Sequence, residues 1–175
     1  MDILLYNLKK LEVCVMTMRE EAARNAFKSG FNCSQSIMAA FADLLPIPRE
    51  TALLVASGFG GGMGRLREVC GAVTGIFMVA GMLYGYNDAN DYEGKKQLYG
   101  TIQELAGEFK ADSGSIICRD LLGQTGKDNS AVPSKRTEEY YKVRPCEEKI
   151  ALAVRILEKH IAAVEAAEHN GPCED

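Results

Sequence analysis

Cysteine is the residue type in this sequence with the widest chemistry. The 175 residues include six cysteines, against two histidines and no tryptophan. A thiolate can bind a metal ion or an iron–sulfur cluster, and it can also attack a disulfide. No C-x-x-C pair occurs, although most zinc ribbons and ferredoxin-like sites contain one. The spacing alone therefore identifies no known type of site.

Composition and charge narrow the class of protein. The formal net charge is −4, which argues against a general nucleic-acid binder. The first ten residues lack the order of a secretory signal, in which a basic start precedes an apolar run. The apolar stretch over residues 69–86 contains four glycines, and we expect a buried helix there rather than membrane insertion. We therefore expect a cytoplasmic protein, in which six cysteines indicate metal or redox chemistry before structural disulfides.

Apolar residues recur at helical spacing along most of the chain. Nothing shows the strict alternation of a half-buried strand over more than a few residues. We expect an all-α, single-domain helical bundle over residues 1–175, with an N-terminal helix (1–30), a four-cysteine core (31–168) and a tail (169–175). Within it, the pattern predicts helices ending near Gly30 and near Leu44, and others at about 51–57, 65–84, 91–109, 115–122 and 150–164, with a helical turn near 138–142.

Four of the cysteines lie near the expected starts of these helices. Cys33, Cys118 and Cys146 each extend an apolar stripe by one turn toward the helix N-terminus, whereas Cys70 falls about a turn and a half inside the 65–84 helix. All four thiols are predicted to point inward. Helix N-termini stabilise thiolates, and nearby Arg67, Arg119 and Arg144 could add to this effect. The alternative is that these cysteines are small apolar core residues.

One local sequence resembles a known family. Cys70-Gly71-Ala72-Val73-Thr74-Gly75 is similar to the signature of a bacterial and archaeal family of redox-active proteins, named for a C…GCAxxG…C…C pattern. Cys33, Cys118 and Cys146 match the other three cysteines, and the resemblance spans about residues 22–157. It departs at Val69, where the pattern suggests glycine. Cys14 and Cys173 match nothing in it.

The resemblance implies an all-helical fold and redox chemistry. The leading hypothesis is a [2Fe–2S] or [4Fe–4S] cluster held by Cys33, Cys70, Cys118 and Cys146, in a protein that transfers electrons to a redox partner protein or an oxidoreductase. The alternatives are a thiol–disulfide oxidoreductase or redox sensor that uses the same cysteines, and a structural zinc protein. Whether the chain is itself an enzyme stays open.

Three further features of the sequence lead to predictions. The glycines of residues 58–64 lack the Gly-Lys-Ser/Thr of a P-loop, and we expect the backbone of Gly60, Gly61, Gly62 and Gly71 to lie near the cysteine site. A Leu-rich seam over residues 4–22 predicts either packing on the bundle or a homodimer through the N-terminal helix. His160 and His169, together with the glutamates of the last helix (Glu147, Glu148, Glu158 and Glu165), are expected to face solvent.

Overall fold

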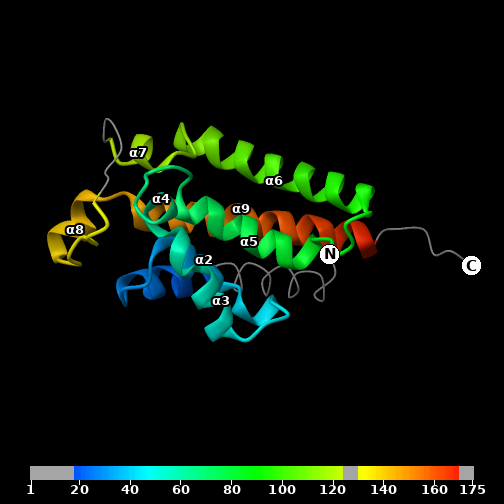
Figure 1. Ribbon diagram of the computed structural model, residues 1–175, viewed down its shortest axis with the longest axis horizontal. Helices are drawn as coiled ribbons and strands as arrows, with labels where there is room; N and C mark the ends of the chain where they lie inside the picture. Colours follow the sequence, from blue (N-terminus) through cyan, green and yellow to red (C-terminus); the bar gives the residue numbers. More distant parts are fainter. Residues whose placement is uncertain (1–17, 124–129, 170–175) are drawn as a thin grey trace, which may run out of the picture.

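The computed structural model describes residues 18–123 and 130–169, and this part of the chain is all-α (Figure 1). A first helix covers residues 18–28. The later helices are α2 (Cys33–Ala40), α3 (Arg49–Ala56), α4 (Gly60–Met63), α5 (Gly71–Tyr84), α6 (Tyr92–Ser113), α7 (Cys118–Leu121), α8 (Glu138–Val143) and α9 (Cys146–His169), with 3-10 turns η1 (Ala42–Leu44) and η2 (Ser57–Phe59). The predicted fold class is confirmed, and among these residues strand pairing is limited to the isolated bridge between Val69 and Ile117.

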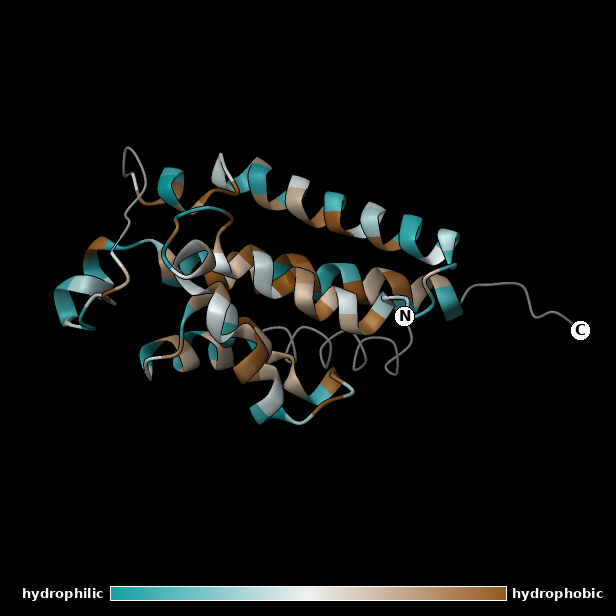
Figure 2. Ribbon diagram, viewed as in Figure 1, coloured by the Kyte–Doolittle hydropathy of each residue, from teal (hydrophilic) through white to brown (hydrophobic). Residues whose placement is uncertain are grey.

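Helices α5 and α9 form the centre of the bundle. Helix α6 packs along one side of them, and α2 with α3 packs on the other (Figure 1). Figure 2 shows hydrophobic residues concentrated along the two central helices. The fully buried side chains include Ile37, Val73, Ile76, Val79, Phe109, Ile150, Val154 and Leu157. Their burial supplies the main driving force for folding, and it fixes how the first residues of α2, α5 and α9 lie relative to one another.

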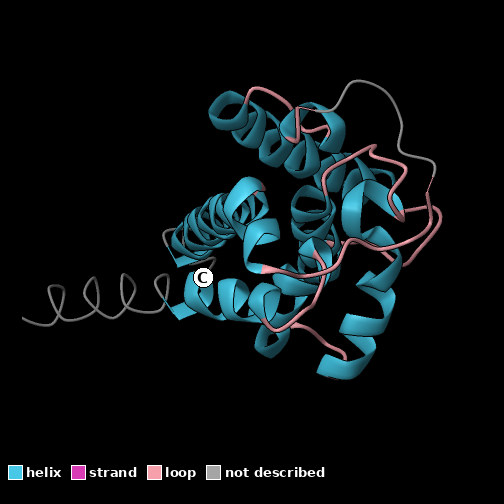
Figure 3. Ribbon diagram, turned by 90° about the vertical axis from the view of Figure 1, so that its left-hand side faces the viewer, coloured by secondary structure: helices cyan, strands magenta, loops and turns pink. Residues whose placement is uncertain are grey.

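Short elements gather at one end of this bundle. The left-hand end of Figure 1 holds α4, α7 and α8 together with the first residues of α5 and α9, and this end faces the viewer in Figure 3. The connections at this end carry much of the irregular backbone of the described residues, including left-handed φ angles at Met63, Arg65 and Arg67. The long helices thus hold this end in place, while its loops determine its local shape.

The central helix is shorter than predicted. It begins at Gly71 rather than near Arg65, and Cys70 is its N-cap residue. Arg65 and Arg67 have φ angles of 71° and 61°, which a right-handed helix does not allow. The backbone N–H of Cys70 donates to the carbonyl of Ile116 at 2.8 Å. This contact with a distant segment competes with helix formation before residue 71, and hydropathy alone gives no sign of it.

Among the described residues, no helix is long and apolar enough to cross a membrane.

The N-terminal seam is only partly described. The buried face of the 18–28 helix consists of Ala23, Ala26 and Phe27, whereas Met18 of the predicted seam is 64% exposed. The remainder of the seam, from Leu4 to Val15, lies outside the described residues, and the homodimer stays a prediction.

Helix α2 ends earlier than expected, because its last predicted turn is a separate element. The α-helix stops at Ala40, and Ala42–Leu44 forms the 3-10 turn η1, in which Leu44 is 37% exposed. The two prolines that follow at 46 and 48 prevent the helix from resuming. The predicted turn near residues 138–142 is present as α8, and Asp91 caps α6 by accepting a hydrogen bond from the N–H of Gly94.

Glu158 on α9 was expected to face solvent, and this prediction is wrong. The residue is 6% exposed, and its nearest cationic partner is Arg19, whose Nε lies 4.0 Å from Oε1. Neither carboxylate oxygen has a hydrogen-bond partner. Burial raises the pKa of the carboxyl from its ordinary 4.5 to about 7, although Arg19 opposes the shift. His160 is also half-buried, and the centroid of its ring lies 5.7 Å from that of the Tyr84 ring. Glu158 and His160 are both shielded because they lie beside the buried stripe of α9.

Replacing Glu158 with leucine is expected to stabilise the protein at pH 8. A buried carboxylate without hydrogen bonds is costly, and well-packed apolar replacements of buried charges gain about 1–4 kcal/mol in favourable cases. Because the folded-state pKa is raised, the stability contributed by Glu158 falls as pH rises from about 4.5 to 7. The gain in melting temperature should therefore be larger at pH 8 than at pH 5. The exposed Glu165 on the same helix is the control, and an equal gain in Glu165→Leu would contradict this explanation.

Candidate functional site

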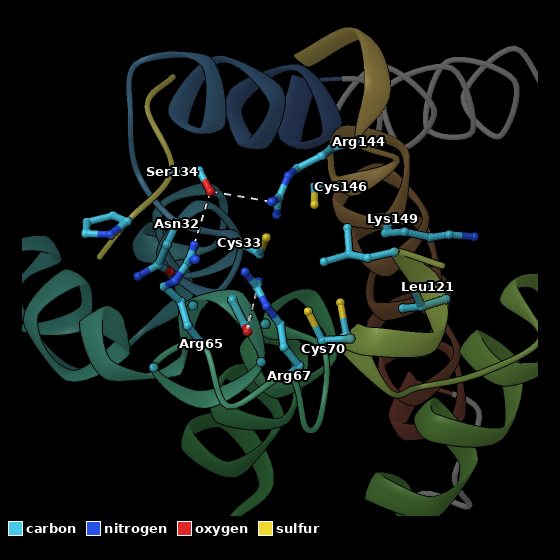
Figure 4. A pocket seen from close by; sticks show the side chains of 18 of the residues that line it. Asn32, Cys33, Arg65, Arg67, Cys70, Leu121, Ser134, Arg144, Cys146 and Lys149 are labelled. Atoms are coloured by element: carbon cyan, nitrogen blue, oxygen red, sulfur yellow. Dashed lines mark hydrogen bonds between the residues drawn. The ribbon is translucent and has the colours of Figure 1, made fainter. Parts of the chain in front are cut away.

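A cavity of about 380 Å³ opens at the end of the bundle where the short elements gather, and all four motif cysteines line it (Figure 4). Cys33, Cys70 and Cys118 are buried, whereas Cys146 is partly exposed, and all four are free thiols. The four residues are far apart in the sequence and come from four different helix starts. The tertiary structure therefore brings them to one place. Cys14 and Cys173 lie outside the described residues.

Each of these cysteines occupies a helix N-terminus. Cys33, Cys118 and Cys146 are the first residues of α2, α7 and α9, and Cys70 is the N-cap of α5. The position predicted for Cys70, inside its helix, is thus corrected, because the helix begins later than expected. At this position the backbone N–H groups of Ala72 and Val73 act to lower the pKa of its thiol. Free N–H groups at helix starts favour a thiolate over a thiol.

A short stretch of paired backbone holds Cys70 beside Cys118. The bridge between Val69 and Ile117 is antiparallel. On either side of it, the N–H of Cys70 donates to Ile116 O at 2.8 Å, and the N–H of Cys118 donates to Glu68 O at 2.7 Å. These bonds fix the two cysteines at the start of two different helices. They also explain why the segment before α5 is extended.

Cys33 and Cys146 form the most closely coupled pair of thiols. The Cys33 and Cys146 thiols lie close enough to act on each other's pKa. The interaction with Cys33, together with Arg144, Arg136 and Arg67, lowers the pKa of Cys146 to about 7, against the effect of burial. The interaction with Cys146, followed by burial, raises the pKa of Cys33 well above its ordinary value. The pair therefore loses its first proton near pH 7, and we assign the negative charge to Cys146.

The other two thiols stay protonated at neutral pH. Burial raises the pKa of Cys70 to about 12, and the two helix N–H groups only partly offset it. Burial also raises the pKa of Cys118, although the Arg67 guanidinium donates a hydrogen bond to its sulfur. As the side chains lie, the site holds one thiolate and three thiols. Its single nucleophile is the one cysteine that is also partly exposed.

Among the described residues, the charged side chains of the cavity wall are all cationic. They are Arg65, Arg67, Arg136, Arg144 and Lys149. Arg67 is 1% exposed, and Figure 4 shows its guanidinium directed into the space near Cys33 and Cys70. Sequence proximity had suggested Arg67 and Arg144. It had also suggested Arg119, which pairs instead with Glu68 at 3.1 Å.

Two of these cations carried no signal in the sequence. Arg65 was assigned to the start of the predicted 65–84 helix, and Arg136 lies in a polar segment ten residues from the nearest motif cysteine. Arg136 reaches the cavity because its side chain stacks on Phe27 and Tyr140, with its guanidinium carbon 4.6 and 4.8 Å from the ring centroids. In the sequence, only the aromatic residues Tyr140 and Tyr141, which follow Arg136 closely, indicated such packing.

The four glycines expected near the site do line the cavity. A Cβ on Gly62 would lie 2.6 Å from the Cβ of Cys118, and one on Gly71 would lie 3.0 Å from the Cβ of Cys33. Gly61 and Gly62 also adopt φ angles of 65° and 71°, which favour glycine. The backbone can therefore approach the thiols closely. Whether these glycines contact a bound group stays a prediction.

The cysteines fit a metal centre in kind and number, but not in their present spacing. Four thiols on one cavity supply the complete ligand set of a [2Fe–2S] or [4Fe–4S] cluster. Among the described residues, however, no group of three or more histidine, cysteine or acidic side chains is spaced to hold a metal ion. Ligation would therefore require side-chain movement and the loss of further protons.

Comparison with known proteins places this site in a family. The model of the family described as "Putative redox-active protein (C_GCAxxG_C_C)" matches residues 31–160, which include all four cavity cysteines. The chain belongs to this family. The resemblance drawn from the motif around Cys70 is thereby confirmed, with redox activity as its general function. No curated protein and no solved structure matched the chain.

Proposed function

We propose that the four-cysteine cavity is a thiol–disulfide redox centre in which Cys33 and Cys146 are the reactive pair. The observation that carries this proposal is that Cys33 and Cys146, the first residues of α2 and α9, line one cavity and act on each other's pKa. It places a thiol next to a sulfur that is ionised near pH 7. A nucleophilic cysteine and an adjacent resolving cysteine are what disulfide exchange requires.

The reaction can be written from these two residues. The Cys146 thiolate attacks one sulfur of a disulfide, whose S–S bond breaks, and the other sulfur leaves as a thiolate that takes up a proton from water. Cys33 then loses its proton to solvent and attacks the Cys146 sulfur of the mixed disulfide, releasing the second thiolate, which is protonated in turn. The chain is oxidised by two electrons to a Cys33–Cys146 disulfide, and the disulfide substrate is reduced to two thiols.

The surroundings support each stage of this exchange. Arg144 and Arg136 stabilise the Cys146 thiolate, and the partial exposure of Cys146 allows a disulfide to reach it. Cys70 and Cys118 remain protonated, because burial raises both of their pKa values. They are therefore poor competitors for the mixed disulfide. A cytoplasmic setting, as expected from the sequence, would keep the pair reduced between turnovers.

Locating the disulfide tests the proposal directly. Reduced protein oxidised with an excess of hydroxyethyl disulfide, digested and analysed by mass spectrometry should contain a Cys33–Cys146 bond. Cys70 and Cys118 should be recovered as thiols. Formation of a Cys70–Cys118 bond with Cys33 still reduced would show that the wrong pair has been assigned, and a protein that remains fully reduced would show that the cavity is not a disulfide centre.

An iron–sulfur cluster held by Cys33, Cys70, Cys118 and Cys146 is a second candidate. A specific observation favours it: four thiols from four elements share one cavity, and the charged side chains that line it within the described residues are all cationic. Such a lining would stabilise an anionic cluster and raise its reduction potential. When bound, a cluster would supply one-electron transfer. The residues of the chain would contribute the four thiolates and the arginine charges around them.

Anaerobic reconstitution separates this candidate from the first. If a cluster forms, iron and sulfide should be bound stoichiometrically, and alanine at any one of the four cavity cysteines should remove most of both. Cys14→Ser and Cys173→Ser are the matched controls and should bind as much iron as the unsubstituted chain. Zinc is measured in the same samples, because stoichiometric zinc without iron would favour a structural zinc site. Iron loss in a control variant would mean that the ligand set is different.

A further inference from the structure

Tyr140 and two arginines form an unusual group on the wall of the cysteine cavity. Arg136 and Arg144 both stack on the Tyr140 ring, and each guanidinium carbon lies 4.8 Å from the ring centroid. All three residues line the cavity. Two like charges are thus held beside one aromatic ring, although like charges repel. The π face of the tyrosine offsets part of this repulsion.

Neither arginine is neutralised by a carboxylate of the described chain. The ion pairs of the described residues leave out Arg136 and Arg144. Arg136 donates from Nη2 to the carbonyl of Phe31 at 3.2 Å, while its Nη1 is buried and has no hydrogen-bond partner. Arg144 donates only a long bond, from Nη2 to Ser134 Oγ at 3.4 Å. Both guanidiniums therefore keep donors that the rest of the described chain does not use.

A second convergence of cationic groups lies next to this one. The hydroxyl of Ser134 accepts a hydrogen bond from Arg65 Nη1 at 3.1 Å as well as the bond from Arg144 (Figure 4). Arg65, Arg136 and Arg144 line the same cavity as Cys146. A molecule that enters this cavity to reach Cys146 would therefore meet these cations.

We propose that Arg136 and Arg144 bind the carboxylate groups of a low-molecular-weight disulfide and hold its sulfurs against Cys146. Guanidinium groups recognise planar oxyanions through paired hydrogen bonds. A cavity of about 380 Å³ is in the range of small-molecule sites, which favours a small substrate over the face of a partner protein. The reaction in this inference rests on the proposed disulfide exchange, whereas the binding of the carboxylate groups does not.

Disulfides of different charge test the proposal. The probes are oxidised glutathione, which carries carboxylates, the neutral hydroxyethyl disulfide and the cationic cystamine. The measured quantity is the rate of oxidation of the reduced chain by each probe, expressed as a ratio to the neutral probe. A change in the pKa of Cys146 alters all three rates together and cancels in this ratio. We expect Arg144→Gln to lower the ratio for oxidised glutathione by about tenfold, because a charge-assisted contact is lost.

Matched variants control for structure and for charge in general. Arg144→Lys should restore part of the ratio. Lys142→Gln removes the same charge from α8, where Lys142 is exposed and pairs only weakly with Glu138 at 3.9 Å, and it should leave the ratio unchanged. Thermal melts confirm that each variant is folded. A ratio that is the same in Arg144→Gln as in the unsubstituted chain, or the fastest reaction with cystamine, would overturn the proposal.

A binding measurement keeps this inference separate from the proposed function. S-methylglutathione has the same carboxylates but no disulfide, and its binding to the reduced chain is measured by titration calorimetry. Binding that weakens about tenfold in Arg144→Gln, in a chain that reacts with none of the disulfides, would support the anion site and overturn the exchange reaction. The absence of binding, with equal reaction of all three disulfides, would overturn the anion site and leave the exchange reaction standing.

Discussion

Serine at position 146 is expected to lower the rate of disulfide exchange at pH 7 by about a hundredfold or more. Cys146 supplies the single thiolate of the cavity near neutral pH, because its interactions with Cys33 and with three arginines lower its pKa to about 7. The three remaining thiols have raised pKa values. At pH 7 a thiol with a pKa of about 9 or higher is ionised to about 1% or less, and only the thiolate attacks.

The pH dependence gives the same experiment a second measurement. Since the pKa of Cys146 is lowered, the rate in the unsubstituted chain should rise as pH increases through about 7 and then level off. In Cys146→Ser the remaining reaction should rise only above about pH 9. Stopped-flow measurements with hydroxyethyl disulfide from pH 5 to 10 would record both curves. Identical curves for the two proteins would show that Cys146 is not the nucleophile.

Cys33→Ser is the informative companion variant. It retains the nucleophile but lacks the thiol that resolves the mixed disulfide, so it should accumulate a stable adduct on Cys146, visible as a mass increase. Its first step should also be slower at pH 7, because loss of the interaction with Cys33 lets the pKa of Cys146 rise. Cys173→Ser is the control and should behave as the unsubstituted chain. Rapid release of the adduct in Cys33→Ser would mean that another thiol resolves it.

Alanine at position 75 is expected to lower the unfolding free energy by about 1–2 kcal/mol. Gly75 lies in α5 where this helix crosses α2, and an added Cβ would lie 2.7 Å from the Cβ of the fully buried Ile37. The contact is between rigid parts of two packed helices, so that one of them has to move, and overpacking of this kind typically costs 1–3 kcal/mol. The gain in helix propensity from glycine to alanine, about 1 kcal/mol, only partly offsets it.

Gly81 provides a matched control within the same helix. A Cβ on Gly81 meets no atom within 4 Å, so Gly81→Ala should raise the unfolding free energy by about 0.4–1 kcal/mol. Urea denaturation of both variants measures the difference. Because Cys33 lies one turn before Ile37 on α2, Gly75→Ala should also weaken the coupling between Cys33 and Cys146 and lower the exchange rate. If the two glycine variants were equally stable, the close packing of α2 against α5 would be incorrect.

Local pattern predicted most of the helical framework. The stripes of α6 and α9 appear where their spacing placed them, since a helix that buries one face needs apolar residues every three or four positions. Cys33, Cys118 and Cys146 were placed at helix starts for the same reason, because each stands one turn before an apolar stripe. The motif around Cys70 indicated the family. These features depend on residues close together in the sequence.

The prediction failed where distant segments decide the conformation. The start of α5 was placed six residues too early, because residues 65–70 contain no helix-breaking glycine or proline but are held by the bridge from Val69 to Ile117. Glu158 was assigned to solvent, although it faces the helix over residues 18–28, where Arg19 lies 4.0 Å away. The glycines at 75 and 81 look alike in the sequence, and only the position of Ile37 distinguishes them.

The same distinction between local pattern and distant contacts applies to the chemistry of the site. The sequence by itself determined which thiols could act together and that Cys33, Cys118 and Cys146 lie near helix starts, because residue type and helical period are local properties. Only the tertiary structure decided that Cys33 pairs with Cys146, that Cys146 carries the charge, and that Arg136 and Arg144 stand beside it. The physical reason is that burial, hydrogen bonding and charge act over a few ångströms, between side chains up to 113 positions apart in the chain.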